Sequence, residues 1–262
     1  MRRKMFCIAT LVTMMLIVGA SVSADVKRIA YPQIKVELTP AYTPDAAFNS
    51  FRTEFIDSVA RKDAKALFTL VAPGFLWTVN NNLASDFDPG RDAQHNFRVV
   101  FGFRALGSIA DSEVEGGPFW DNLAAFANES TYYQSTEGRN LVCSPVAASI
   151  IDEEVFKQVR AKIETPGEGA DWYFIVRSTA VTIAPGDKGA PIATLGLEAV
   201  PVLSTYPLPD SGAAPTHYEV LLPSGRVGWI PANAARPFQA DQLCYALTAK
   251  GEWKIAIYDS AE

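Results

Sequence analysis

Hydrophobic and polar positions near the start of the chain repeat with the period of an α-helix. Five apolar residues share one face of this helix: Phe48, Phe51, Phe55, Ile56 and Val59. We expect the helix to begin at Pro44 with Thr43 as its N-cap, because proline is favoured in a first helical turn. Asp63 then caps a second, shorter helix that ends before Pro73-Gly74. The aromatic and β-branched residues 75–79 that follow are typical of a strand.

The middle of the chain predicts two further helices. Residues 86–107 contain a turn and scattered apolar positions, and we expect them to be irregular. A short helix follows Gly116-Gly117-Pro118, with apolar residues at helical spacing: Phe119, Trp120, Leu123 and Phe126. Residues 152–163 begin with acidic and end with basic side chains, which agrees with the dipole of a helix. The turn-forming residues 165–169 close this helix and mark the predicted domain boundary.

After that boundary the pattern changes to short strands separated by turn residues. The predicted strands are 172–176, 180–183, 193–202, 217–222, 227–230, 244–247 and 253–258. Strands this short need closure or packing to be stable, which predicts a small β-barrel. We therefore expect an α+β protein. Its parts are an extended tether or short edge strand over 25–43, a helix-rich α/β domain over 44–166 and a small barrel with the terminal strands over 170–262.

The most specific stretch of the chain is a predicted hairpin. Tyr218 opens its first strand, Gly225 lies in its turn, and Gly228-Trp229-Ile230 form the returning strand. Gly225 can take the positive φ of a tight turn, while Gly228 leaves space where the barrel bends and Trp229 packs. This pattern resembles a bacterial Src-homology-3-like (SH3-like) domain, and the resemblance covers about residues 172–235. A Pro/Gly/Ala-rich loop over residues 204–216 is longer than is usual in that family.

The SH3-like resemblance implies a non-catalytic domain that binds cell-wall glycan or peptide, or another envelope protein. Aromatic side chains suit such ligands because they offer a broad contact area with few rotatable bonds. The candidate ligand-binding residues are Tyr206, Tyr218 and Trp229. A purely structural interpretation stays open, in which Trp229 belongs to the core of the barrel.

The end of the chain offers a second resemblance. The segment Gly251-Glu252-Trp253-Lys254-Ile255, with the N-terminal helices and strand, is similar to nuclear-transport-factor-like cone folds. That resemblance implies a small-ligand or catalytic site in the N-terminal domain, with Trp77, Asp92 and His95 as candidates. Asp92 lies three residues from His95 and is placed to orient its ring. A terminal barrel strand explains the same segment equally well.

The first 24 residues have the features of a cleavable export signal. Arg2-Arg3-Lys4 precede an uncharged run over 5–19, and small residues end at Ala24. The run is shorter than the ~20 residues that span a bilayer. We expect cleavage between Ala24 and Asp25 and a periplasmic or secreted protein with no membrane anchor. Cleavage leaves 20 basic residues of the original 23 against 29 acidic ones, and this charge disfavours nucleic acid and anionic lipid as partners.

Two cysteines, Cys143 and Cys244, remain after the expected cleavage. An even number of cysteines in an oxidising compartment favours a disulfide over buried or free thiols. In the loop-entropy model, closing a loop of ~100 residues contributes about 4.7 kcal/mol. No CxxC or HxxxH spacing accompanies the pair, so we do not expect a metal site.

Catalytic and cofactor motifs are not evident in the sequence. His95 and His217 are the only histidines, and no acidic pair has the surroundings of a glycosidase site. The chain has no Gly-rich phosphate loop. We therefore expect a non-catalytic exported module, without a cofactor, that recognises cell-wall peptidoglycan or another envelope component. The alternatives are the cone-type site and a purely structural protein, and the oligomeric state is not defined by the sequence.

Overall fold

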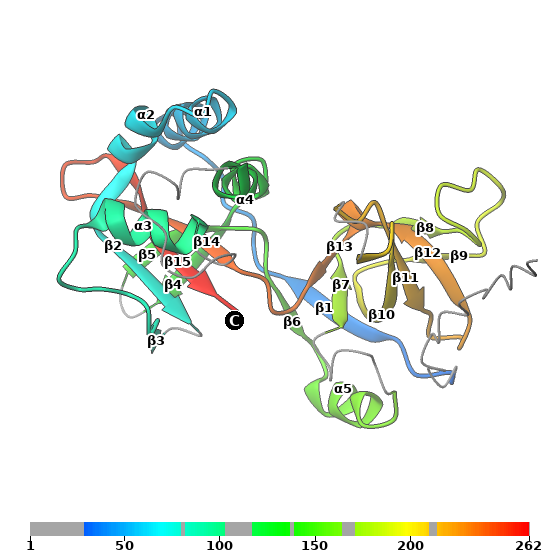
Figure 1. Ribbon diagram of the computed structural model, residues 1–262. Helices are drawn as coiled ribbons and strands as arrows, with labels where there is room; N and C mark the ends of the chain where they lie inside the picture. The colour runs from blue at the N-terminus through cyan, green and yellow to red at the C-terminus, as the bar shows by residue number, and fades with distance from the viewer. Residues whose placement is uncertain are drawn as a thin grey trace, which may run out of the picture.

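The chain forms two lobes, each with its own hydrophobic core (Figure 1). The computed structural model describes residues 29–79, 82–102, 117–136, 139–163, 171–209 and 214–261. The predicted export signal and its cleavage site at Ala24 and Asp25 lie outside the described residues. Within the described part of the chain the fold is α+β, with five α-helices and a majority of strands among its elements.

The first lobe is built on a six-stranded sheet in the order β3-β2-β15-β14-β5-β4. Its strands are β2 (Val71–Val79), β3 (Asn82–Leu83), β4 (Tyr132–Thr136), β5 (Arg139–Ser144), β14 (Gln242–Leu247) and β15 (Trp253–Ser260). Strand β15 runs parallel to β2, and the other neighbouring pairs are antiparallel. The sheet therefore combines strands from both halves of the chain.

Four helices pack against this sheet. They are α1 (Ala46–Ala60), α2 (Ala64–Thr69), α3 (Ala93–Gly102) and α4 (Gly117–Ala127). Asp63 caps α2 as predicted, but α1 is capped by Asp45 rather than Thr43, because the Asp45 carboxylate accepts the N–H of Phe48 at 2.7 Å. Helix α3 lies in the segment that we expected to be irregular. Its buried Phe97, Val100 and Phe101 have helical spacing.

Aromatic rings form the centre of the first core. Tyr245 is fully buried, and the rings of three phenylalanines on α1 lie 5.3–6.2 Å from its ring centroid: Phe48, Phe51 and Phe55. The Tyr245 hydroxyl accepts a hydrogen bond from Arg52 at 2.9 Å and lies 3.1 Å from the Ser144 hydroxyl. Burial raises the pKa of Tyr245. The predicted apolar face of α1 is thus the face that meets the sheet.

Among the described residues, the second lobe contains a seven-stranded sheet, a separate strand pair, one α-helix and one short 3-10 helix. Its elements are β1 (Ile34–Leu38), β6 (Ala148–Ile150), α5 (Glu153–Arg160), β7 (Trp172–Ile175), β8 (Thr179–Val181), β9 (Ala193–Leu195), β10 (Glu198–Tyr206), β11 (His217–Leu221), β12 (Val227–Pro231) and β13 (Ala235–Pro237). The main order is β12-β11-β10-β1-β6, while β7 pairs with both β10 and β13. Among the described residues these strands do not close into a barrel.

The predicted tether and domain boundary need correction. Residues 34–38 form β1, which pairs with β10 on one side and β6 on the other and buries Ile34 and Val36. Helix α5 belongs to the second lobe rather than the first, because Phe156 packs on Trp172 with ring centroids 5.0 Å apart. The chain instead crosses between the lobes after β1, after β5 and after β13.

The terminal strands also lie in a different lobe from the one predicted. The ranges 44–166 and 170–262 assign β14 and β15 to the barrel domain. In the structure, however, β14 pairs with β5 and β15 pairs with β2 in the first lobe. Backbone hydrogen bonding between distant segments decides this placement, which the alternation within each strand does not encode. The second lobe therefore lies, in sequence, largely between β5 and β14.

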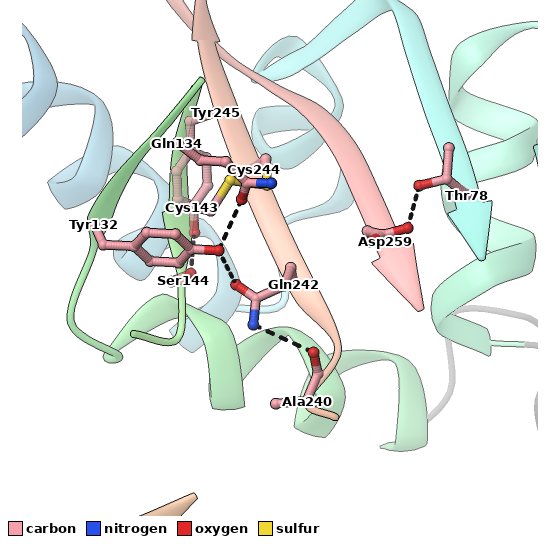
Figure 2. Close-up of a disulfide and its surroundings, with 10 residues drawn as sticks. All are labelled: Thr78, Tyr132, Gln134, Cys143, Ser144, Ala240, Gln242, Cys244, Tyr245 and Asp259. Atoms are coloured by element: carbon pink, nitrogen blue, oxygen red, sulfur yellow. Dashed lines mark hydrogen bonds between the residues drawn. A yellow bond between two sulfur atoms is a disulfide. The ribbon is translucent and has the colours of Figure 1, made fainter. Parts of the chain in front are cut away.

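A disulfide joins the two ends of this intervening segment (Figure 2). Cys143 on β5 and Cys244 on β14 are direct cross-strand partners with Cα atoms 4.0 Å apart, and their sulfur atoms are bonded. This finding confirms the predicted pair. The bond closes a sequence separation of 101 residues, which holds most of the second lobe. The cystine is buried between Tyr132 and Leu141 on the face of the sheet away from Tyr245.

The two hairpin glycines have distinct roles. Gly225 has φ +77°, which confirms its expected turn conformation. At Gly228, an added Cβ would lie 2.4 Å from Cγ1 of Val181 and 2.9 Å from Cδ1 of Ile192. The absence of a side chain at Gly228 therefore allows β12 to pack closely on β8, as expected for a position where strands approach.

Removing the disulfide should destabilise the protein. We expect a Cys143→Ala/Cys244→Ala double variant to lose about 2–5 kcal/mol of unfolding free energy, because its unfolded chain regains the freedom of a ~100-residue loop. Urea unfolding of the oxidised protein and the variant measures the difference. A reducing agent should lower the wild-type midpoint and leave the variant unchanged. Equal stability of the two oxidised proteins would contradict the expected role.

The Gly228→Ala variant tests the packing of β12 on β8. We expect it to lose about 1–3 kcal/mol of unfolding free energy, because Val181 and Ile192 must move to admit the methyl group. Gly196→Ala is the matched control in the same lobe: nothing lies within 4 Å of its added Cβ, so the change should stay within about 0.5 kcal/mol. Urea unfolding followed by tryptophan fluorescence compares the two. Similar losses would show that crowding at Gly228 is not the cause.

Candidate functional site

Three strands of the second lobe, β10, β11 and β12, place a group of polar and aromatic residues on one face. Cross-strand partners share a face of a sheet, and residues two apart on a strand share it as well. Ser204 pairs with Glu219, which pairs with Trp229, and Tyr206 pairs with His217. We call the face that carries these five residues the aromatic face. The opposite face carries Val220 and Ile230, which are buried in the core of the lobe.

Tyr206 and Trp229 meet on the aromatic face. Their ring centroids lie 6.4 Å apart with nearly perpendicular planes, and the Tyr206 side chain is 52% exposed. Trp229 is half-buried. It is therefore not a core residue, as it would be if the barrel were purely structural. Ser204 donates a hydrogen bond to Glu219 Oε2 at 2.8 Å, which orients this carboxylate. The result is an accessible aromatic pair beside an oriented carboxylate.

Tyr218 does not belong to this group. As a neighbour of His217 and Glu219 on β11, its side chain points to the opposite face, where its ring lies 5.0 Å from that of Tyr173. Burial raises the pKa of Tyr218. Burial also raises the pKa of Tyr173, and together with the neighbouring Tyr218 and Asp171 it brings this pKa to about 12. The structure therefore does not bring Tyr218 together with Tyr206 and Trp229.

The alternative site residues in the first lobe have structural surroundings. Trp77 is buried in the core among the helices, and its Nε1 atom has no hydrogen-bond partner among the described residues. Asp92 precedes α3 and accepts the backbone N–H of His95 at 2.7 Å, so it caps the helix and does not bond the His95 ring. His95 Nδ1 lies 3.3 Å from a guanidinium nitrogen of Arg91. These contacts do not assemble the three residues into a site.

Two neighbouring cavities lie where the first lobe meets the crossing segments. The outer cavity, of about 360 Å³, is lined by Glu129, Pro145, Arg236 and Gln239 among others. The inner cavity, of about 230 Å³, lies between α3, α4 and β15. Both are lined by Ala125, Phe126 and Asp241. No sequence pattern pointed to this place, because its residues come from segments that are far apart in the chain.

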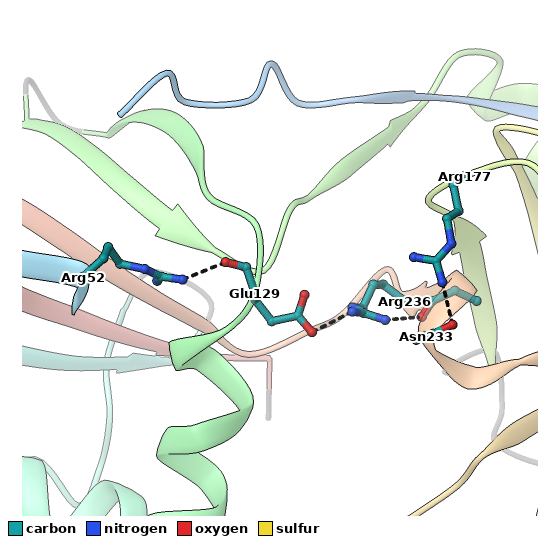
Figure 3. Close-up of polar contacts among 6 residues, drawn as sticks. Arg52, Glu129, Arg177, Asn233 and Arg236 are labelled. Atoms are coloured by element: carbon teal, nitrogen blue, oxygen red, sulfur yellow. Dashed lines mark hydrogen bonds and ion pairs between the residues drawn. The ribbon is translucent and has the colours of Figure 1, made fainter. Parts of the chain in front are cut away.

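An arginine–glutamate–arginine chain joins the lobes next to the outer cavity (Figure 3). Arg52 on α1 donates to the carbonyl oxygens of Ala127 and Glu129 at 2.7 and 2.8 Å, at the C-terminal end of α4. The Glu129 carboxylate then binds Arg236 of β13 at 2.6 Å. Both partners are mostly buried, so this ion pair is better shielded from solvent than a surface pair. The Glu129–Arg236 ion pair forms part of the wall of the outer cavity.

The described residues include no group of three or more His, Cys, Asp or Glu side chains that is able to hold a metal ion. Among the described helices, none has both the length and the apolar character of a membrane span. No family model matches the chain, and no curated protein or solved structure is significantly similar to it.

The half-buried Tyr173–Tyr218 pair predicts a fall in stability at high pH. Tyrosine ionises near pH 10 in an unfolded chain, whereas the pKa of Tyr173 is about 12 in the folded protein. Between these values the folded state holds a proton that the unfolded state has lost, so the unfolding free energy decreases as pH rises. We expect a Tyr173→Phe variant to show a smaller decrease between about pH 9 and about pH 11 in urea unfolding. An equal decrease in both proteins would contradict the burial of this phenol.

Proposed function

We propose that this protein is an exported, non-catalytic binding protein of the cell envelope, and that its second lobe recognises cell-wall peptidoglycan. One observation carries the proposal: Tyr206 and Trp229 lie together on an accessible face beside the oriented carboxylate of Glu219. The neighbouring His217, whose Nδ1 atom lies 3.1 Å from the Thr216 hydroxyl, adds a further polar group to the same face.

The chemistry of the aromatic face suits this ligand. Sugar rings have apolar C–H faces that pack on aromatic side chains, and their hydroxyl groups donate to carboxylates. The near-perpendicular rings of Tyr206 and Trp229 form a corner rather than a flat stack, which offers two contact surfaces to a chain of sugars or to the peptide attached to it. Rigid aromatic side chains lose little conformational entropy on binding.

The proposal includes two family resemblances. For the second lobe, an SH3-like relationship is supported by the β11–β12 hairpin with Gly225 in its turn and Gly228 packed on β8. For the first lobe, a cone-type relationship is supported by two helices that lead into β2, and by the Trp253 strand, β15, lying parallel beside it. On this view the SH3-like unit is inserted, in sequence, between strands β5 and β14 of the cone-type sheet.

Export is the remaining part of the proposal. The Cys143–Cys244 bond supports it, because structural disulfides persist in oxidising compartments such as the periplasm. The basic and apolar residues at the start of the sequence support it independently. A periplasmic or secreted location brings the aromatic face within reach of the cell wall.

Retention on purified peptidoglycan sacculi tests the proposal. We expect the mature protein to be retained, and Tyr206→Ala and Trp229→Ala to weaken binding about tenfold or more, because exposed aromatic anchors dominate such interfaces. Glu219→Gln should weaken it as well, through loss of the charged acceptor. Depletion of protein from solution at increasing sacculus concentration gives the apparent Kd.

Tyr133→Ala is the matched control for this experiment. Tyr133 is similarly exposed, at 45%, but lies on β4 of the first lobe, so its loss should leave retention unchanged. Circular dichroism shows that each variant is folded. If Tyr206→Ala, which removes a side chain from the surface, is retained as well as the wild type, the proposed ligand-binding face is wrong.

A further inference from the structure

The two lobes do not share a hydrophobic core within the described part of the chain. Their buried apolar side chains form separate clusters, two in the first lobe and two in the second. Two lobes of one chain are expected to move relative to each other unless a large apolar interface holds them together. The orientation of the lobes therefore depends on the crossing segments and on the polar contacts beside them.

The crossing segments after β1 and after β5 form a two-stranded ribbon. Strand β1 pairs with β6, and beyond this pairing the N–H of Thr39 donates to the carbonyl oxygen of Ala147 at 2.9 Å. We call residues 36–39 and 147–150 the ribbon. Two-stranded ribbons take up more twist than wider sheets and are only marginally stable by themselves. The ribbon therefore connects the lobes without making their orientation rigid.

The crossing segment after β13 is a short strap. On the side of the second lobe, the N–H of Phe238 donates to the carbonyl oxygen of Trp172 at 3.3 Å. On the side of the first lobe, Asp241 accepts the N–H of Ala261 at 3.1 Å. We call residues 239–240, which lie between these two anchors, the strap. A connection of this length limits how far the lobes separate, but it leaves them free to rotate.

The Glu129–Arg236 ion pair bridges the lobes beside the ribbon and the strap (Figure 3). On the first lobe, Arg52 donates both to the backbone carbonyl of Glu129 and to the hydroxyl of the buried Tyr245. On the second lobe, Arg236 also donates to the carbonyl oxygen of Ala235 at 2.9 Å. A continuous set of hydrogen bonds therefore runs from the core of the first lobe to β13.

The outer cavity shows where a rotation of the lobes is possible. One wall contains Phe126 and Glu129 of the first lobe, and the other contains Arg236 and Pro237 of the second. The cavity has a volume of about 360 Å³, so the lobes are not packed against each other at this place. A rotation about the ribbon and the strap changes the width of the cavity and leaves both cores intact.

We propose that the Glu129–Arg236 ion pair is a clasp that holds the two lobes in the described orientation. When the clasp opens, the second lobe pivots about the ribbon and the strap, and the outer cavity widens because its walls belong to different lobes. The aromatic face moves as part of the second lobe. This inference concerns the conformation of the chain and does not depend on peptidoglycan recognition.

Double electron–electron resonance tests the clasp by measuring the distance between the lobes. Spin labels are attached to Glu54→Cys on α1 and Gln158→Cys on α5, because both positions are exposed and lie on helices of different lobes. The labelled parent should give one narrow distance distribution. Glu129→Ala and Arg236→Gln should each broaden it about twofold or more, because the ribbon and the strap then set the orientation alone.

Glu252→Ala is the matched control. It removes an ion pair within the first lobe, in which Lys254 lies 3.5 Å from Glu252 and has the same side-chain exposure as Arg236, 21%. This change should leave the distribution as narrow as in the parent. Combining Glu129→Ala with Arg236→Gln should broaden it no more than either change alone, because the two side chains act as one contact.

Circular dichroism verifies that each variant is folded, and Glu129→Gln, which keeps the length of the side chain, replaces Glu129→Ala if that variant unfolds. Narrow distributions in both single variants would overturn the clasp, because the lobes would then hold their orientation without the ion pair. Equal broadening in Glu252→Ala would also overturn it, since the effect would not depend on a contact between the lobes.

Discussion

The antiparallel pairing of β5 with β14, bonded covalently through Cys143 and Cys244, holds the two parts of the chain in one fold. Strand β14 brings β15 to the centre of the first sheet, where β15 pairs with β2. Without this pairing the helices would cover an incomplete sheet. The cost of bringing together segments about 100 residues apart is entropic, and the disulfide reduces it by restricting the unfolded chain. The same bond joins the two strands between which most of the second lobe lies in sequence.

The aromatic face and the two cavities lie in different structural surroundings. The aromatic face lies on β10, β11 and β12, whose residues contact one another within the second lobe. Asp241 lines the inner cavity and lies in the segment that joins β13 of the second lobe to β14 of the first. The position of its carboxylate therefore depends on the path of this segment. The ion pair between Glu129 and Arg236 joins the lobes near that point, and Arg52 fixes the backbone of Glu129. These contacts tie one wall of the outer cavity to the arrangement of the lobes.

Local features of the fold could be predicted where neighbouring residues supply the interaction. The buried face of α1, the Asp63 cap of α2 and the apolar spacing of α4 all follow from local sequence. Helix α3 was missed, although Phe97, Val100 and Phe101 have helical spacing, because the turn residues before it obscured the pattern. The candidate site was only partly predictable: Tyr206 and Trp229 lie together, whereas Tyr218 alternates to the opposite face.

By itself the sequence determined the helical faces, the turn at Gly225 and the pairing of two cysteines, because each depends on local geometry or on composition. The tertiary structure alone decided that β1 joins the second sheet and that β14 and β15 join the first, since strand pairing is a choice among distant partners. A register shift between Val202 and Ser204 also turns Ser204 toward the aromatic face while Val202 stays inside. Strict alternation would place both residues on one side, so the bulge, which forms only against β11, sets which side chains are available for binding.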